Sequence, residues 1–171
     1  MMFRIPESLE TDRLLLRTFR EDDWKDLHDY YSDEICTRYT AGRALDVNET
    51  WREVAIRAGH WLLRGYGPYA VEEKASKKVV GIIGLWYPLE WPEPEITWHL
   101  SRRYFYKGFA REGTRAVLNM AKEYMPEITF ISIIHPENGT SIRLAETLHA
   151  QFEKMIHFRK GMWCLYRHQK Q

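Results

Sequence analysis

The sequence has little cysteine, no long apolar run and almost no net charge. Cys36 and Cys164 are the only cysteines among 171 residues, too few for a secreted disulfide framework and without Cys-x-x-Cys spacing. No run approaches ~18 apolar residues and the first residues form no apolar signal core, so we expect a cytoplasmic protein without a membrane partner. Lys and Arg total 25 against 24 Asp and Glu, which disfavours a nucleic-acid binder because such proteins carry a strongly basic face.

The sequence also lacks the residue spacings that are typical of metal sites and nucleotide-binding loops. The seven histidines are scattered without His-x-x-x-His or mixed Cys/His spacing, so the sequence predicts no metal site. The glycines of segment 80–84 lack the context of a Walker or dinucleotide loop. Aromatic residues reach 14%, which we interpret as a few large core residues and an aromatic-lined pocket. The length suits a single domain over residues 1–171.

Hydrophobic periodicity predicts strands and helices that alternate along the chain. Strands are expected over 12–19, 69–73, 79–87, 95–101, 128–134, 152–158 and 162–167, with the prolines of 88–94 in a loop. Helices are expected from the acidic residues 21–23 onward, from Asn48 as cap to about 64, over 108–124 and over 138–149. This order indicates an α+β or mixed α/β sandwich around one sheet.

Two of these helices carry an apolar stripe that should face the core. In the helix after Asn48 the stripe is Trp51, Val54, Ala55, Ala58, Trp61 and Leu62. In the helix 108–124 it is Phe109, Ala116, Val117, Met120, Ala121 and Tyr124.

The segment 95–113 has the most chemical content. An expected strand leads through a loop of aromatic and basic residues to Gly108, which opens a helix. The first N–H groups of a helix lack intrahelical acceptors and, with the helix dipole, form a natural phosphate site. Gly108 and the small Ala110 would let the backbone approach a ligand closely. The cationic rim of this loop comprises Arg102, Arg103, Lys107 and Arg111. The alternative from these residues alone is an ordinary strand-to-helix turn with a solvated rim.

Three blocks of sequence stand out by their order along the chain. They are Leu9-Glu-Thr-Asp-Arg-Leu-Leu-Leu-Arg17, then Glu95-Ile-Thr-Trp-His-Leu100 leading to Tyr106-Lys-Gly-Phe-Ala-Arg-Glu112, then Asn138-Gly-Thr-Ser-Ile-Arg-Leu-Ala-Glu146. Together they resemble the GNAT superfamily of N-acetyltransferases, in particular its ribosomal-protein-alanine acetyltransferase branch. The resemblance spans nearly the whole chain. It implies a central mixed, mostly antiparallel sheet of about seven strands flanked by about four helices.

The resemblance also implies acetyl-CoA as the acetyl donor. The backbone of Leu100 and Ser101 would bond the pantetheine arm, and the amides of 106–111 would wrap the pyrophosphate. Asn138 would bond the pantetheine as well, and Ser141 would lie near the thioester sulfur. The cofactor-binding residues expected on this basis are Leu100, Ser101, Arg103, Tyr106, Lys107, Gly108, Phe109, Ala110, Arg111 and Asn138.

Three positions depart from the family pattern. Phe105 stands where the superfamily has Gln or Arg, and Tyr106 where Gly is common, which bears on the conformation of the pyrophosphate loop. Ala145 stands where many members carry a tyrosine general acid, so Ser141 remains as the acid. From the residues alone, Asn138 is also a helix cap with Ser141 at its partner position.

Glu95 and His99 are the candidate bases. Both alternate onto one face of their strand with Thr97, and Glu95 lies in sequence beside Glu90 and Glu93. This acidic, aromatic corner would attract a cationic amine. The alternative is that Glu90 and Glu93 are solvated charges of a loop without a functional role. The base is left open between Glu95, His99 and an ordered water.

We therefore expect an acetyl-CoA-dependent N-acetyltransferase that moves the acetyl group to a primary amine by direct attack in a ternary complex. The alternatives are a non-catalytic acetyl-CoA-binding module of the same fold and an RNA-associated protein that uses its loop arginines. The acceptor is open between a peptide N-terminus and a small-molecule amine. The oligomeric state, including a homodimer, is open as well.

Overall fold

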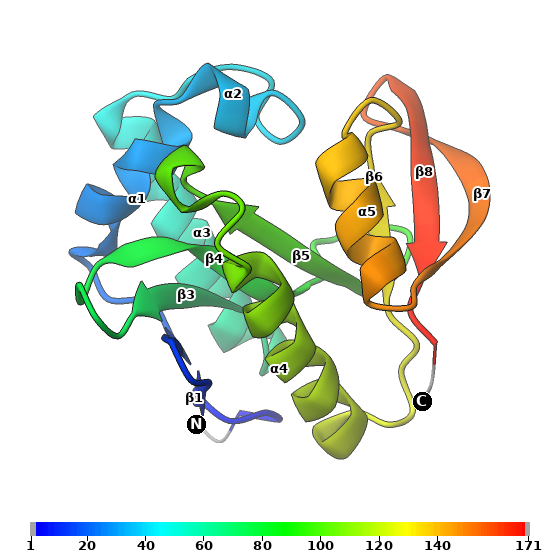
Figure 1. The fold of residues 1–171 in the computed structure, drawn as a ribbon, viewed down its shortest axis with the longest axis horizontal. Coiled ribbons are helices and arrows are strands. Elements are labelled where there is room, and N and C mark those ends of the chain that lie inside the picture. The colour runs from blue at the N-terminus through cyan, green and yellow to red at the C-terminus, as the bar shows by residue number, and fades with distance from the viewer. Residues whose placement is uncertain (1–2, 170–171) are drawn as a thin grey trace.

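One eight-stranded sheet organises the part of the chain that the structure describes, residues 3–169 of a computed structural model (Figure 1). The strands lie in the order β1-β2-β3-β4-β5-β6-β8-β7, and every neighbouring pair is antiparallel except β5 and β6. Their bounds are β1 Ser8–Glu10, β2 Leu14–Arg17, β3 Pro68–Glu73, β4 Val79–Trp86, β5 Glu95–Leu100, β6 Ile131–Ile134, β7 Gln151–Phe158 and β8 Gly161–Arg167. The expected mixed, mostly antiparallel sheet with flanking helices is confirmed.

Five α-helices flank the sheet within the described residues. They are α1 Asp23–Tyr31, α2 Glu34–Thr37, α3 Val47–Arg64, α4 Phe109–Tyr124 and α5 Gly139–Thr147, and a 3₁₀ turn covers Arg102–Tyr104. The sequence pattern missed β1 and α2 because elements of three and four residues show no periodicity. No helix in the described part of the chain is long and apolar enough to cross a membrane.

The helices divide between the two faces of the sheet (Figure 1). One face packs on α4, where Val117 and Met120 join Leu16, Ile83 and Ile96 in a buried cluster. The other face packs on α1 and α3 through a second buried cluster of Leu27, Tyr30, Tyr31, Leu45, Val54, Ala70, Val79 and Ile82. Helix α5 covers β6 and β8 through Ala145 and Ile134. The site described below lies where these three packed units meet.

Four local predictions need correction. Asp46, not Asn48, caps α3, because its carboxylate accepts the Glu49 N–H while the Glu49 side chain accepts the Asp46 N–H. The buried face of α3 centres on Thr50, Val54, His60 and Trp61, so Trp51 and Leu62 are exposed. Tyr124 is exposed at the last turn of α4. Strand β6 begins at Ile131 rather than at 128, because the Ile128 N–H is still in a turn with the Met125 carbonyl.

The parallel pair β5 and β6 touches at one register position only, Glu95 opposite Ile131. Beyond it the two strands diverge (Figure 1). Where the strands begin to diverge, two side chains make hydrogen bonds between β5 and β6 in place of backbone-to-backbone bonds. The Ile133 N–H donates to the Glu95 carboxylate at 2.9 Å, and the Ser132 hydroxyl donates to the Ile96 carbonyl at 2.7 Å. The sheet therefore opens at a fixed point.

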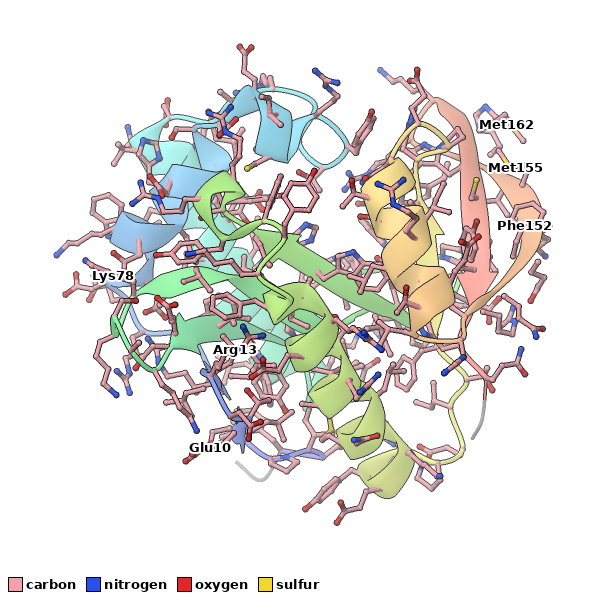
Figure 2. All side chains as sticks on the ribbon, in the orientation of Figure 1. Glu10, Arg13, Lys78, Phe152, Met155 and Met162 are labelled. Atoms are coloured by element: carbon pink, nitrogen blue, oxygen red, sulfur yellow. The ribbon has the colours of Figure 1, made fainter. Side chains whose placement is uncertain are left out.

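The outer edge of the sheet exposes apolar side chains. Figure 2 shows Phe152, Met155 and Met162 on β7 and β8, directed away from the rest of the molecule. All three are more than two-fifths exposed, at 54%, 41% and 50%.

Gly81 lets β4 and β5 approach each other. A Cβ at this position would lie 2.0 Å from the backbone carbonyl oxygen of His99. We expect Gly81→Ala to lower the free energy of unfolding by about 2 kcal/mol or more, because the two strands must move apart. Denaturant unfolding measures this change.

Gly59→Ala on α3 is the matched control. A Cβ there meets nothing within 4 Å, and alanine suits a helix interior better than glycine. This variant should equal or exceed the parent in stability. A Gly81→Ala protein as stable as Gly59→Ala would contradict the close approach of the strands.

Candidate active site

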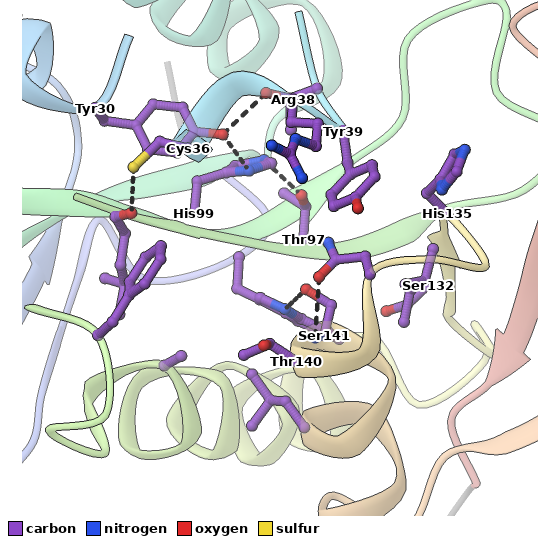
Figure 3. A pocket seen from close by; sticks show the side chains of 18 of the residues that line it. Tyr30, Cys36, Arg38, Tyr39, Thr97, His99, Ser132, His135, Thr140 and Ser141 are labelled. Atoms are coloured by element: carbon purple, nitrogen blue, oxygen red, sulfur yellow. Dashed lines mark hydrogen bonds between the residues drawn. The ribbon is translucent and has the colours of Figure 1, made fainter. Parts of the chain in front are cut away.

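A cavity of about 460 Å³ lies where β5 and β6 have parted (Figure 3). Its walls are β5, the end of β6, the first turns of α4 and α5, and the segment 35–40, which includes the end of α2. Most of the site residues expected from the sequence line it: Glu95, His99, Leu100, Tyr106, Gly108, Phe109, Ala110, Arg111, Asn138 and Ser141. Ser101, Arg103 and Lys107 do not.

The edge of β5 that faces the opening has unused backbone groups. The Ser101 N–H donates to the Val80 carbonyl at 2.9 Å, which shows which residues of β5 direct their backbone groups toward β4. Because bonding direction alternates along a strand, Trp98 and Leu100 turn their backbone N–H and C=O groups toward β6, where no ladder forms. Leu100 can therefore offer its backbone N–H to a ligand, and its carbonyl, which accepts the Cys36 thiol at 3.7 Å, keeps a second lone pair. The Ser101 amide is already engaged.

The start of α4 is a second set of unused donors. Gly108 caps the helix with φ of +82°, and no side chain caps the N–H groups that follow it. The amides of Phe109, Ala110 and Arg111 thus have no intrahelical acceptor and meet at the cavity. Together with the helix dipole they can bind a phosphate group.

Tyr106 takes the backbone conformation that glycine commonly supplies in this loop. Its φ is +61°, in the left-handed region, and its side chain is 89% exposed. A non-glycine residue in this region costs about 1–2 kcal/mol. The loop therefore keeps a positive φ at this position, with some strain, despite the tyrosine.

Arg13 anchors the loop from the far end of the chain. Its backbone N–H and Nε donate to the Glu112 carboxylate at 2.9 and 2.7 Å, and its Nη1 donates to the Lys107 carbonyl at 2.8 Å. The guanidinium also lies over the Phe109 ring, 4.6 Å from its centroid. Arg13 stands in the first of the three sequence blocks, but no sequence pattern predicts its role, because its partner Glu112 is distant in the sequence.

Two of the four cations of the basic rim are paired with carboxylates. Arg102 pairs with Asp33 and Arg103 pairs with Asp29, each at 2.8 Å, and both arginine side chains are exposed. The Lys107 ammonium lies over the Tyr104 ring, 5.0 Å from its centroid. Arg111 is the member of this rim that lines the cavity.

Glu95 is buried at the point where the strands part. One carboxylate oxygen accepts the Trp91 indole N–H at 2.6 Å and the other accepts the Ile133 N–H at 2.9 Å. Burial raises the pKa of Glu95 from 4.5 to about 7, and the two N–H donors and the Arg159 charge oppose that rise. The side chain thus exchanges a proton near neutral pH.

His99 lies on the same face of β5, and both ring nitrogens are occupied. Nδ1 is 3.1 Å from the Tyr30 hydroxyl and Nε2 is 2.8 Å from the Thr97 hydroxyl (Figure 3). Burial, followed by the charges of Arg57 and Arg159, lowers the pKa of His99 to about 3. The imidazole is therefore neutral at physiological pH and weakly basic.

Ser141 lies across the cavity from Glu95, at the start of α5. Its backbone N–H donates to the Asn138 side-chain oxygen at 3.3 Å, so Asn138 caps the helix as the residue pattern predicts. Its hydroxyl oxygen accepts the Trp98 indole N–H at 3.2 Å. Because the oxygen is held as an acceptor, the hydroxyl hydrogen remains available as a donor. Trp98 was missed as a site residue because its partner lies on another element.

The acidic corner does not form part of the cavity. Glu93 makes a two-bond pair with Arg167, at 2.8 and 2.9 Å, and this pairing lowers the pKa of Glu93. Neither Glu90 nor Glu93 lines the cavity, which leaves Glu95 as its carboxylate. Among residues 3–169, no group of three or more His, Cys, Asp or Glu side chains is placed to hold a metal ion.

Comparisons with known proteins agree with this geometry. The model of an acetyltransferase (GNAT) domain matches residues 13–151. An uncharacterized N-acetyltransferase, p20, of Bacillus licheniformis is 28% identical over 153 residues, covering 88% of this chain and 85% of that protein. A GNAT-family acetyltransferase structure from Bacillus anthracis is 26% identical, with a TM-score of 0.78 and coverage of 94% and 95%. A RimL ribosomal L7/L12 alpha-N-protein acetyltransferase in complex with coenzyme A shares the fold, at 15% identity, a TM-score of 0.73 and coverage of 95% and 96%.

The raised pKa of Glu95 predicts a pH-dependent stability. The folded protein binds this proton more tightly than the unfolded chain, so the contribution is fully present below pH 4.5 and is lost as pH rises through about 7. Relative to Glu95→Gln, which cannot titrate, the parent should lose about 3 kcal/mol of unfolding free energy across that window. Denaturant unfolding from pH 4.5 to 8.5 measures the difference.

The control is Glu90→Gln, which removes an exposed carboxylate from the same corner. Its stability should follow the parent at every pH. Parallel curves for the parent and Glu95→Gln would show that Glu95 titrates alike in the folded and unfolded chains, contrary to this expectation.

Proposed function

The chain belongs to the GNAT acetyltransferase family and is an N-acetyltransferase, and on that basis we propose that it moves the acetyl group of acetyl-CoA directly to a primary amine within a ternary complex. Members of this family act on amines, and the RimL relative is in complex with coenzyme A. We place the whole activity in one domain over residues 1–171. The observation that carries the proposal is the cavity between β5 and β6, with a free strand edge on one wall and unpaired helix N–H groups on another.

The residues around the cavity fit the donor from end to end. The N–H groups of Phe109, Ala110 and Arg111 would hold the pyrophosphate, and Arg13 would keep their loop in place. The backbone of Leu100 would hold the pantetheine arm along the open edge of β5. Bound in this way, the donor supplies an activated thioester carbonyl beside Ser141.

Glu95 is the base in this proposal. The amine attacks the thioester carbonyl carbon, the new C–N bond forms, and the C–S bond breaks. Glu95 receives the proton that the amine loses, Ser141 gives its hydroxyl proton to the departing thiolate, and solvent carries a proton from Glu95 back to Ser141. A base works best when its pKa lies near the working pH, which Glu95 meets at about 7 and His99, at about 3, does not.

The cost of deprotonation separates acceptor classes. A lysine-like amine with a pKa near ~10.4 costs about 4–5 kcal/mol to deprotonate at pH 7, against about 1 kcal/mol for an α-amine. A base of moderate strength such as Glu95 suits an α-amine better. We propose an α-amine, of a peptide N-terminus or of a small molecule.

Two observations bear on the alternatives. A non-catalytic module would be favoured if tyrosine in place of glycine changed the pyrophosphate loop. Tyr106 keeps a positive φ, so the loop conformation is retained. Arg102 and Arg103 pair with Asp33 and Asp29, which removes two of the cations available for RNA. The homodimer remains a prediction.

The release of free thiol from acetyl-CoA with a panel of amines tests the function. Gly108→Leu should weaken acetyl-CoA binding by about tenfold or more, because a side chain at the helix start strains the positive φ and enters the phosphate site. Calorimetry measures the affinity. Gly42→Leu is the matched control, since Gly42 also has a positive φ but lies outside the cavity. Equal affinity in the two variants would move the donor site elsewhere.

Ser141→Ala should lower kcat tenfold to a hundredfold, which is about the effect of removing one proton donor. The KM for acetyl-CoA should change little, because the Asn138 cap contacts the Ser141 backbone and not its hydroxyl. Steady-state thiol release measures both constants. Thr140→Ala, which removes the neighbouring hydroxyl from the cavity wall, should leave kcat near that of the parent. A fully active Ser141→Ala enzyme would exclude Ser141 as the acid.

A further inference from the structure

The cavity reaches both faces of strand β5. Trp98 contacts Ser141 of α5 on one face, which is the face of α4 and the proposed donor. His99 contacts Tyr30 of α1 on the other face. The second half of the cavity, lined by Arg38, Tyr39, Thr40, Thr97, His99 and His135, is left for the acceptor. We call it the acceptor half.

Arg38 is the cation of this half. It follows α2 directly, and Figure 3 shows its side chain turned toward Tyr39 and His99. Its guanidinium carbon is 6.0 Å from the centroid of the Tyr39 ring. Arg102 and Arg103 nearby pair with Asp33 and Asp29, whereas no carboxylate among residues 3–169 lies within 4.0 Å of the Arg38 guanidinium nitrogens.

A second arginine adds positive charge to the rim. Arg159 reaches across from the β7–β8 turn and donates to the Thr40 carbonyl at 2.8 Å. Its charge lowers the pKa of His99 and opposes the rise in the pKa of Glu95, so its field reaches both candidate bases. The remaining arginine close to His99, Arg57, pairs with Glu53 at 2.5 Å. The acceptor half therefore carries the positive charge of two arginines without an ion-pair partner among residues 3–169, while the exposed Glu137 carboxylate lies 3.8 Å from His135.

This charge decides which amine fits. Arg38 and Arg159 would repel a simple ammonium ion, and Glu95, protonated for part of the neutral pH range, and the neutral His99 offset that repulsion little. A guanidinium beside the amine also favours the neutral form, which is the form that attacks a thioester. A carboxylate on the acceptor would pair with Arg38 in a charge-assisted contact and fix the orientation of the amine.

We propose, on the basis of the proposed function, that the acceptor is an amine with a carboxylate close to it, and that Arg38 binds this carboxylate. Two sources share this chemistry. One is a free α-amino acid, with its own carboxylate, and the other is a peptide whose first residue is acidic.

Matched pairs of acceptors separate the sources. The first pair is L-alanine and L-alaninamide, with kcat/KM expressed per concentration of neutral amine, because a neighbouring carboxylate raises the pKa of an amine. The second pair is the C-terminal amide of Glu-Ala-Ala and that of Gln-Ala-Ala. In at least one pair the carboxylate member should have a kcat/KM about tenfold higher, the usual effect of one charged hydrogen-bonded contact. The pair that shows the preference identifies the source.

Arg38→Gln should abolish that preference by raising KM for the carboxylate member about tenfold, with kcat, the neutral member and the KM for acetyl-CoA little changed. Arg38→Glu should reverse the preference. Arg52→Gln, which removes an exposed arginine of α3 outside the cavity, is the matched control and should behave as the parent.

The failures are distinguishable. Transfer to both members of each pair at equal kcat/KM would overturn the role of Arg38 and leave the proposed function standing. A change in KM for acetyl-CoA alone in Arg38→Gln would also overturn it, by assigning Arg38 to the donor. Binding of acetyl-CoA without transfer to any amine would overturn the proposed function and this inference with it.

Discussion

The site depends on a broken ladder of hydrogen bonds between β5 and β6. Parallel neighbours normally continue their bonding along the whole shared length, but here the pairing ends at Glu95 and Ile131. A parted strand leaves buried backbone groups unsatisfied, at a cost of about 1–3 kcal/mol each. The Glu95 carboxylate and the Ser132 hydroxyl take the places of the missing partners. These two side chains therefore lower the cost of opening the strands.

Glu95 consequently serves structure and chemistry with the same two oxygens. The N–H groups of Trp91 and Ile133 stabilise its charged form, while burial stabilises its neutral form. These opposing effects bring its pKa to about 7, where neither form dominates. His99 on the same face meets no such balance, because burial and two arginine charges all favour its neutral form. The position of a carboxylate at the parting of the strands thus determines which side chain can exchange a proton.

Sequence patterns predicted the features that depend on residues close together in the chain. The long helix α4, the Gly108 start and the Asn138 cap follow from periodicity and from residue type within one turn. The sequence missed contacts between residues far apart in the chain. Arg13 meets Glu112 across the sheet, Trp98 meets Ser141, and Glu93 meets Arg167 rather than the site. No spacing rule relates such pairs. The resemblance to a family predicted the phosphate-binding loop before α4, whereas the contacts that hold this loop in place are visible only in the structure.

The contact between Arg13 and Glu112 has a consequence for the order of folding. The two residues are 99 positions apart, so the loop that precedes α4 acquires its anchor only after a large part of the chain has been brought together. Closing so long a segment has an entropic cost, which makes such a contact a late event. The unpaired N–H groups at the start of α4 would then reach their final orientation only once the first hairpin has docked. The affinity for the donor would therefore be high only in the fully folded protein. A chain that has lost β1 and the turn after it would bind the donor poorly, even with every cavity residue intact.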